Sequence, residues 1–234
     1  MWYRKFMRYI TKEEKILYLV LIAMFTMFAI DGFDKSLIEL YNLMFNYISF
    51  VFFYVPAYIY ILLKIIKNIS LPEILVRYES INDLIMDRIK ILFFLCLRIS
   101  IFSVIFSSIF LVLKDINIIY YKEFWLMSIL SIGTQFVGWF FIGLLYLLLV
   151  KIFRHEMLAY IIEILMCTSM IYVLSLTAPV FVKRYIKPLW EIMYFYDFYI
   201  NMKTKVLYIN LTIIISVMII YLYKYLLKSK DIGR

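Results

Sequence analysis

The stretch ILFFLCLRISIFSVIFSSIFLVL, residues 91–113, decides the fold class of this chain. A run of this length crosses roughly 30 Å of hydrocarbon when it forms a helix. Inside lipid every backbone polar group must find its partner within the protein, which leaves only helices or a closed barrel. Barrel strands are about ten residues long and alternate in polarity. This run is longer and does not alternate, so it predicts a membrane-spanning α-helix.

The rest of the chain repeats this pattern. Hydrophobic residues make up 66% of the 234 residues and the mean hydropathy is +0.92, whereas a soluble domain is roughly half apolar. The sequence therefore predicts an all-α integral membrane protein, built as one transmembrane domain over residues 1–234 with six spans. The six predicted spans cover residues 16–30, 44–66, 91–113, 125–150, 157–182 and 206–227.

The orientation follows from the distribution of Lys and Arg between the two sides of the membrane. With the N-terminus inside, sixteen of these residues fall on the cytoplasmic side and eight fall outside. Because cytoplasmic loops carry the excess of Lys and Arg, this ratio predicts that both termini are cytoplasmic. Five of the eight outer charges lie in residues 183–205, and whether this segment is extracellular or re-entrant stays open.

The net charge of +9 is better explained by the membrane than by nucleic acid. Lys and Arg gather at the ends of the apolar runs, where they face anionic lipid headgroups. The abundance of Ile, Lys, Tyr, Phe and Asn suggests an AT-rich genome, and we therefore expect a bacterial cytoplasmic membrane. Cys96 and Cys167 lie inside apolar runs and are interpreted as small hydrophobic residues, not as a disulfide.

Catalytic motifs are missing from the sequence. The chain has one histidine, His155, and no second histidine follows Glu156 at the spacing of a zinc protease. There is no Gly-x-Ser-x-Gly nucleophile elbow and no glycine-rich phosphate loop with lysine. We therefore expect no metal site, no cofactor and no enzymatic activity in this chain.

The segment between the second and third predicted spans, residues 67–90, carries two helix-start signals. Ser70 and Glu73 have the spacing of a capping box, and Ser80 and Asp83 form a second, weaker start. The segment predicts one or two amphipathic helices at the cytoplasmic surface. They are interpreted either as an anchor between two spans or as a docking site for a cytoplasmic partner. The basic N-terminal arm is interpreted either as a second amphipathic helix before the first span or as a simple positively charged anchor on the cytoplasmic side.

A family resemblance rests on this order of elements. The basic arm, the six spans and the capped insert resemble the permease subunits of type-2 ATP-binding-cassette exporters. Within the insert, LVRYESINDLIMDRIK, residues 75–90, is similar to the family's Arg-aromatic-x-Ser segment that leads into the third span. The aromatic segment around Pro179 and Pro188 is similar to the family's broken extracellular helices.

The resemblance implies a dimer of permease subunits, as a homodimer or a heterodimer, and a separate cytoplasmic ATPase that binds ATP and Mg. The cargo would be a peptide, a lipid or a drug-like amphiphile. The alternative is a membrane scaffold, sensor or immunity protein that transports nothing. The insert residues expected to lie near the ATPase are Glu73, Arg77, Tyr78, Glu79 and Asp83.

Glu163 is the most informative residue within the spans. It lies about two turns into the fifth predicted span, where a carboxylate costs a few kcal/mol and should face protein or water. It is interpreted as part of a translocation pathway or subunit contact, as a residue that bonds a neighbouring helix, or as a residue near the lipid headgroups if the span starts later. Gln135 in the fourth span is the candidate partner.

Overall fold

The computed structural model describes residues 2–46, 49–69, 80–172, 193 and 202–228. These residues form helices joined by short connections, and none of the described residues lies in a β-strand. The all-α fold class predicted from the sequence is therefore confirmed.

Five helical stretches are long and apolar enough to cross a membrane, and they coincide with five of the six predicted spans. The predicted fifth span begins in α8 (Glu156–Tyr172), and its remainder, residues 173–182, lies outside the described residues. The five stretches indicate a multi-pass membrane protein. They are Glu14–Gly32, Phe50–Lys67, Asn82–Lys114, Lys122–Phe153 and Val206–Leu227.

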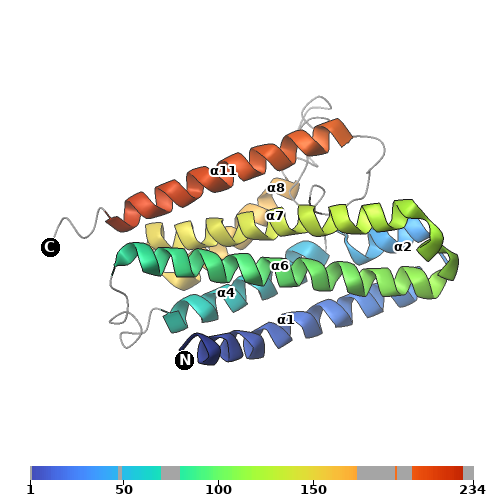
Figure 1. Cartoon of the computed structure of the whole chain (residues 1–234), viewed down its shortest axis with the longest axis horizontal. Helices are drawn as coiled ribbons and strands as arrows, with labels where there is room; N and C mark the ends of the chain where they lie inside the picture. Colours follow the sequence, from blue (N-terminus) through green and yellow to red (C-terminus); the bar gives the residue numbers. More distant parts are fainter. Residues whose placement is uncertain (1, 47–48, 70–79, 173–192, 194–201, 229–234) are drawn as a thin grey trace.

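The long helices lie side by side along the longest axis of the molecule (Figure 1). In chain order they are α1 (Trp2–Gly32), α4 (Val55–Ile69), α6 (Ile81–Lys114), α7 (Lys122–Phe153), α8 and α11 (Met202–Lys228). Each runs opposite to the one before it, so the start of α1 and the end of α11 lie at the same end of the bundle (Figure 1). We call this end, where α6 and α8 also begin, the terminal end.

Two amphipathic segments differ from the expectation of separate surface helices. The basic N-terminal arm is the first part of α1, which continues without a break to Gly32. Residues 81–90 are likewise the first turns of the 34-residue α6. The Ser80 side chain accepts a hydrogen bond from the Asp83 N–H at 3.2 Å, as the sequence predicted for a cap. No glycine or proline stands between residues 81 and 114, so nothing interrupts the helix after this start.

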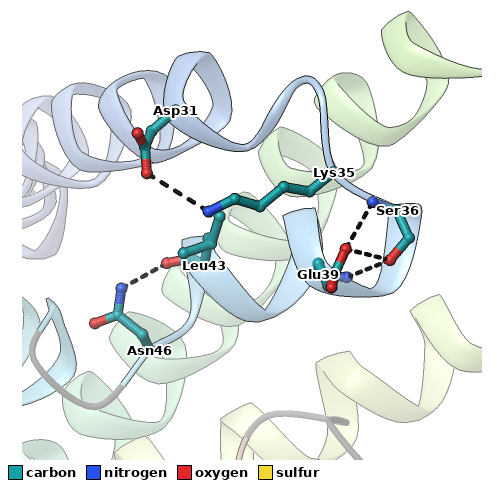
Figure 2. Close-up of polar contacts among 6 residues, drawn as sticks. All are labelled: Asp31, Lys35, Ser36, Glu39, Leu43 and Asn46. Atoms are coloured by element: carbon teal, nitrogen blue, oxygen red, sulfur yellow. Dashed lines mark hydrogen bonds and ion pairs between the residues drawn. The ribbon is translucent and has the colours of Figure 1, made fainter.

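The chain between the first and second spans forms a short separate helix, α2 (Leu37–Met44). Ser36 and Glu39 cap it reciprocally: the Glu39 carboxylate accepts from the Ser36 N–H at 2.9 Å, and the Ser36 hydroxyl oxygen accepts from the Glu39 N–H at 3.3 Å (Figure 2). Asn46 donates to the Leu43 carbonyl at 2.7 Å just beyond the helix. The second span consequently begins at Phe50, later than the predicted residue 44.

A proline within a membrane span usually distorts its helix, and Pro56 lies next to such a distortion at the start of the second span. A π-helical turn, η1 (Phe50–Tyr54), directly precedes it, and the Val55 N–H bonds the Phe50 carbonyl. Proline cannot donate the hydrogen bond that would continue a regular α-helix. The wider turn accommodates this missing donor, a common use of short π segments.

The interior is aromatic and centred on α7. Trp139 and Tyr146 on α7 and Tyr54 and Tyr58 next to Pro56 are among the largest fully buried side chains. Large apolar side chains also cover the outside, and α11 alone exposes Leu207, Ile214, Met218 and others. In water so much exposed apolar surface would drive association, whereas lipid accommodates it.

Candidate intramembrane polar site

Glu163 on α8 is enclosed by protein. Its side chain has 0% exposure, and neither carboxyl oxygen has a hydrogen-bond partner among the described residues. A carboxylate in such surroundings is strongly destabilising unless a proton, a water, an ion or another chain satisfies it. The residue thus faces protein, as the sequence predicted, and its carboxyl group has no hydrogen-bond partner among the described residues.

The neighbours of Glu163 come from α4, α7 and α8 itself. Its carboxyl group lies within electrostatic range of Tyr58, Tyr146 and Cys167. The Tyr146 hydroxyl is also buried without a hydrogen-bond partner among the described residues. We refer to Glu163, Tyr58, Tyr146 and Cys167 as the Glu163 cluster. Two of its members, Tyr146 and Glu163, thus have unsatisfied hydrogen-bonding capacity.

Tyr58, one member of this cluster, is held in position by polar contacts to two other helices. Its hydroxyl donates to the Trp139 carbonyl at 2.8 Å and lies 3.1 Å from the Cys96 sulfur. Gly143 makes room for the hydroxyl, since a Cβ at this position would lie 2.5 Å from it. The tyrosine therefore joins α4, α6 and α7 through polar contacts within an apolar core.

Gln135 is not brought together with Glu163. Its Nε2 donates to the Ser131 hydroxyl at 3.2 Å, and that hydroxyl also lies 3.2 Å from the Tyr41 hydroxyl. Counted from the α7–α8 turn at Arg154, Gln135 stands ten residues farther away than Glu163, which is about 15 Å along the helix axis. The two residues occupy different levels of the bundle.

An ion pair between Glu14 and Arg98 forms a second polar contact between the helices. Arg98 donates through its guanidinium to Glu14, whose side chain is only 1% exposed. Tyr18, one turn later on α1, donates to the same carboxylate at 3.3 Å. The pair joins α1 to α6 across the interior, where a buried charge must be compensated.

Of the predicted coupling residues only Asp83 is described. It lies in the first turn of α6, is exposed, and accepts a hydrogen bond from the Ser80 hydroxyl at 2.7 Å. Glu73, Arg77, Tyr78 and Glu79 lie outside the described residues. Across the part of the chain that is described, no three His, Cys, Asp or Glu residues are grouped to hold a metal ion.

Sequence reasoning missed Glu14, Arg98, Tyr58 and Tyr146. A signal existed for Arg98, because it is the one charged residue within the apolar run 91–113 and requires an acidic partner. No such signal marks the tyrosines, since the chain contains 22 of them. Comparison of the chain with protein-family models, with curated proteins and with solved structures finds no match.

Proposed function

We propose that this chain is the transmembrane permease subunit of an ATP-driven exporter for a peptide, lipid or drug-like amphiphile. It would act in the bacterial cytoplasmic membrane with a second permease subunit and a separate ATP-binding-cassette ATPase, which would bind ATP and Mg. The proposal is supported above all by one observation, the continuity of α6 from its capped start into the membrane.

The length of α6 would allow it to transmit a movement from its polar first turns to its membrane-embedded part. Its 34 residues span about 51 Å at a rise of 1.5 Å per residue, which is about 20 Å more than the hydrocarbon thickness. The excess at the terminal end carries Asp83, Asp87, Arg88 and Lys90. An ATPase that pushed on these polar first turns would move the membrane-embedded part of the same helix.

Polar contacts along α6 would pass such a movement to three other helices. Arg88 donates to the Tyr223 hydroxyl on α11 at 2.8 Å, and Cys96 contacts Tyr58 on α4 at 3.1 Å. Arg98 pairs with Glu14 on α1. Each contact spans two helices, so displacement of α6 would change the environment of Tyr58, whose hydroxyl interacts electrostatically with Glu163.

The test reverses charge at the proposed docking segment. Glu73→Lys and Asp83→Lys should abolish cargo export and co-purification of the ATPase, because a positive side chain would replace the acidic contact. Ser80→Ala is the matched control for Asp83, since it removes the cap while the carboxylate stays. It should cost about 1 kcal/mol of helix stability and leave the ATPase bound.

The outcome also separates this proposal from its alternative. If both charge reversals leave export and ATPase binding at the wild-type level, the docking segment is not a coupling site. If the chain performs its cellular role in a strain that lacks every partner ATPase, it is a scaffold, sensor or immunity protein.

A further inference from the structure

A cavity of about 280 Å³ lies at the terminal end of the bundle, and its described lining does not include Glu163. Its walls come from the last turns of α4, α7 and α11 and the first turns of α6 and α8. Five helices therefore converge on it. The volume is just below the roughly 300–1,000 Å³ typical of sites for drug-sized ligands, so it suits a smaller group.

The polar part of the lining is predominantly cationic. Arg88 of α6, Lys151 of α7 and Arg154 of the following turn face the cavity together with one carboxylate, Glu156. Three positive charges against one negative charge favour an anion. Arg88 is oriented by its hydrogen bond to Tyr223, another lining residue, at 2.8 Å, and Tyr223 is only 2% exposed.

The remaining lining is aliphatic. Ile66, Leu147, Val150 and Leu227 contribute the apolar part of the wall, and all four belong to the ends of membrane-crossing stretches. At that depth a lipid carries its phosphate and glycerol next to the first methylenes of its acyl chains. A site that is cationic on one side and apolar on the other matches this arrangement, whereas inorganic phosphate would leave the apolar wall unused.

We propose that this cavity binds the phosphate headgroup of an anionic phospholipid from the leaflet at the terminal end. Arg154 is exposed and Lys151 is half-buried, so the headgroup enters from the membrane surface. The bound lipid joins α6, α7 and α11 at the level where α6 leaves the membrane. This site does not depend on the presence of an ATPase.

The experiment measures lipid binding to the purified full chain in detergent micelles by native mass spectrometry. The probes are phosphatidylglycerol, zwitterionic phosphatidylcholine and inorganic phosphate. The test variant is Lys151→Gln/Arg154→Asn, in which asparagine tolerates the left-handed backbone of residue 154, with φ of 56°. Lys122→Gln, at the opposite end of the same helix, is the matched control.

The wild type should bind phosphatidylglycerol at least tenfold more tightly than phosphatidylcholine. The double variant should lose about 25-fold in affinity, at roughly fivefold for each cation, and the control should bind as the wild type does. Equal binding of the two lipids, or an unchanged double variant, would overturn the proposal. Phosphate that competes as strongly as the anionic lipid would reassign the cavity to a free anion.

A single variant covers the case in which the double variant does not fold. Arg154→Asn changes only an exposed side chain at a turn, so its folding should match that of the wild type. It should weaken phosphatidylglycerol binding about fivefold. Wild-type affinity in this variant and in Lys151→Gln would exclude a headgroup contact at both residues.

Discussion

At the scale of single residues, Glu163 combines full burial with two carboxyl oxygens that lack hydrogen-bond partners among the described residues. Such a group lowers stability by about 1–3 kcal/mol. Proteins retain costly intramembrane carboxyl groups mainly where they act on a substrate, an ion or a proton. We therefore expect Glu163 to have a functional role and not a stabilising one.

Replacement of Glu163 tests this conclusion. Glu163→Leu should raise the unfolding temperature of the detergent-solubilised protein by about 2–6 °C, because the buried polar group is removed at similar volume, and should abolish export. Gln135→Leu is the comparison, because Gln135 is equally buried but its Nε2 donates to Ser131 and only its Oε1 lacks a partner among the described residues; its unfolding temperature should rise less. A lower unfolding temperature for Glu163→Leu would show that the carboxyl group has a structural partner.

At the scale of helices, side chains of α4 and α6 pack closely against α7 at Gly143. A Cβ there would overlap the Leu92 side chain of α6 and would crowd the Tyr58 hydroxyl of α4. A Cβ added to Gly133, on the same helix, would meet nothing within 4 Å among the described residues. The two glycines therefore differ in their packing although the sequence presents them alike.

Alanine substitution distinguishes the two glycines. Gly143→Ala should destabilise the bundle by about 1–3 kcal/mol, since the crowded core must shift. Gly133→Ala should be neutral or stabilising by up to about 1 kcal/mol, because alanine favours the helix. Unfolding in mixed detergent micelles measures both changes, and equal effects would show that Gly143 is not a close contact.

The cap of α2 lies at the end of the bundle opposite to the terminal end (Figure 1). It predicts that the stability of the fold depends on pH. Hydrogen bonds from the backbone and the side chain of Ser36 hold the pKa of Glu39 below its usual value, and the positive charges of Lys35 and Lys114 contribute to the lowering. A lowered folded-state pKa means that the ionised cap stabilises the fold above the unfolded pKa of about 4.3. This contribution is lost as the pH falls through the lower pKa of the folded state.

The comparison of wild type with Glu39→Gln isolates this effect. The wild type should unfold at a higher temperature than the variant at pH 7, because only the ionised carboxylate keeps the full cap. The difference should disappear as the pH falls below about 4. A difference that persisted unchanged in acid would assign the effect to side-chain shape and not to charge.

The sequence patterns predicted the positions of the helices better than they predicted the contacts between the helices. Apolar runs located the five crossing stretches, and Ser80 and Pro56 marked a start and a distortion that the structure contains. Each of these depends on residues close in sequence. The contact between Glu14 and Arg98 and the separation of Gln135 from Glu163 depend on which helix faces meet, and no local pattern determines that.

At the scale of the whole molecule, the start of α1 and the end of α11 lie at the same end of the bundle (Figure 1). Both are therefore expected on the same side of the membrane. In a variant without native cysteines, Asn117→Cys and Lys187→Cys should react with a membrane-impermeant maleimide on intact cells. Lys230→Cys should react only after permeabilisation, because positive residues predict a cytoplasmic tail. Protection of residue 187 on intact cells would exclude an extracellular position and indicate a re-entrant segment or fewer than six spans.

The ion pair between Glu14 and Arg98 also has a consequence for the order in which the helices assemble during synthesis. The two residues are 84 positions apart, so the ribosome delivers the carboxylate to the membrane well before its arginine exists. During that interval Glu14 must remain at the water interface or take up a proton. The ion pair can therefore form only after the third span has been synthesised, so the contact that joins α1 to α6 is made late in the assembly of the bundle.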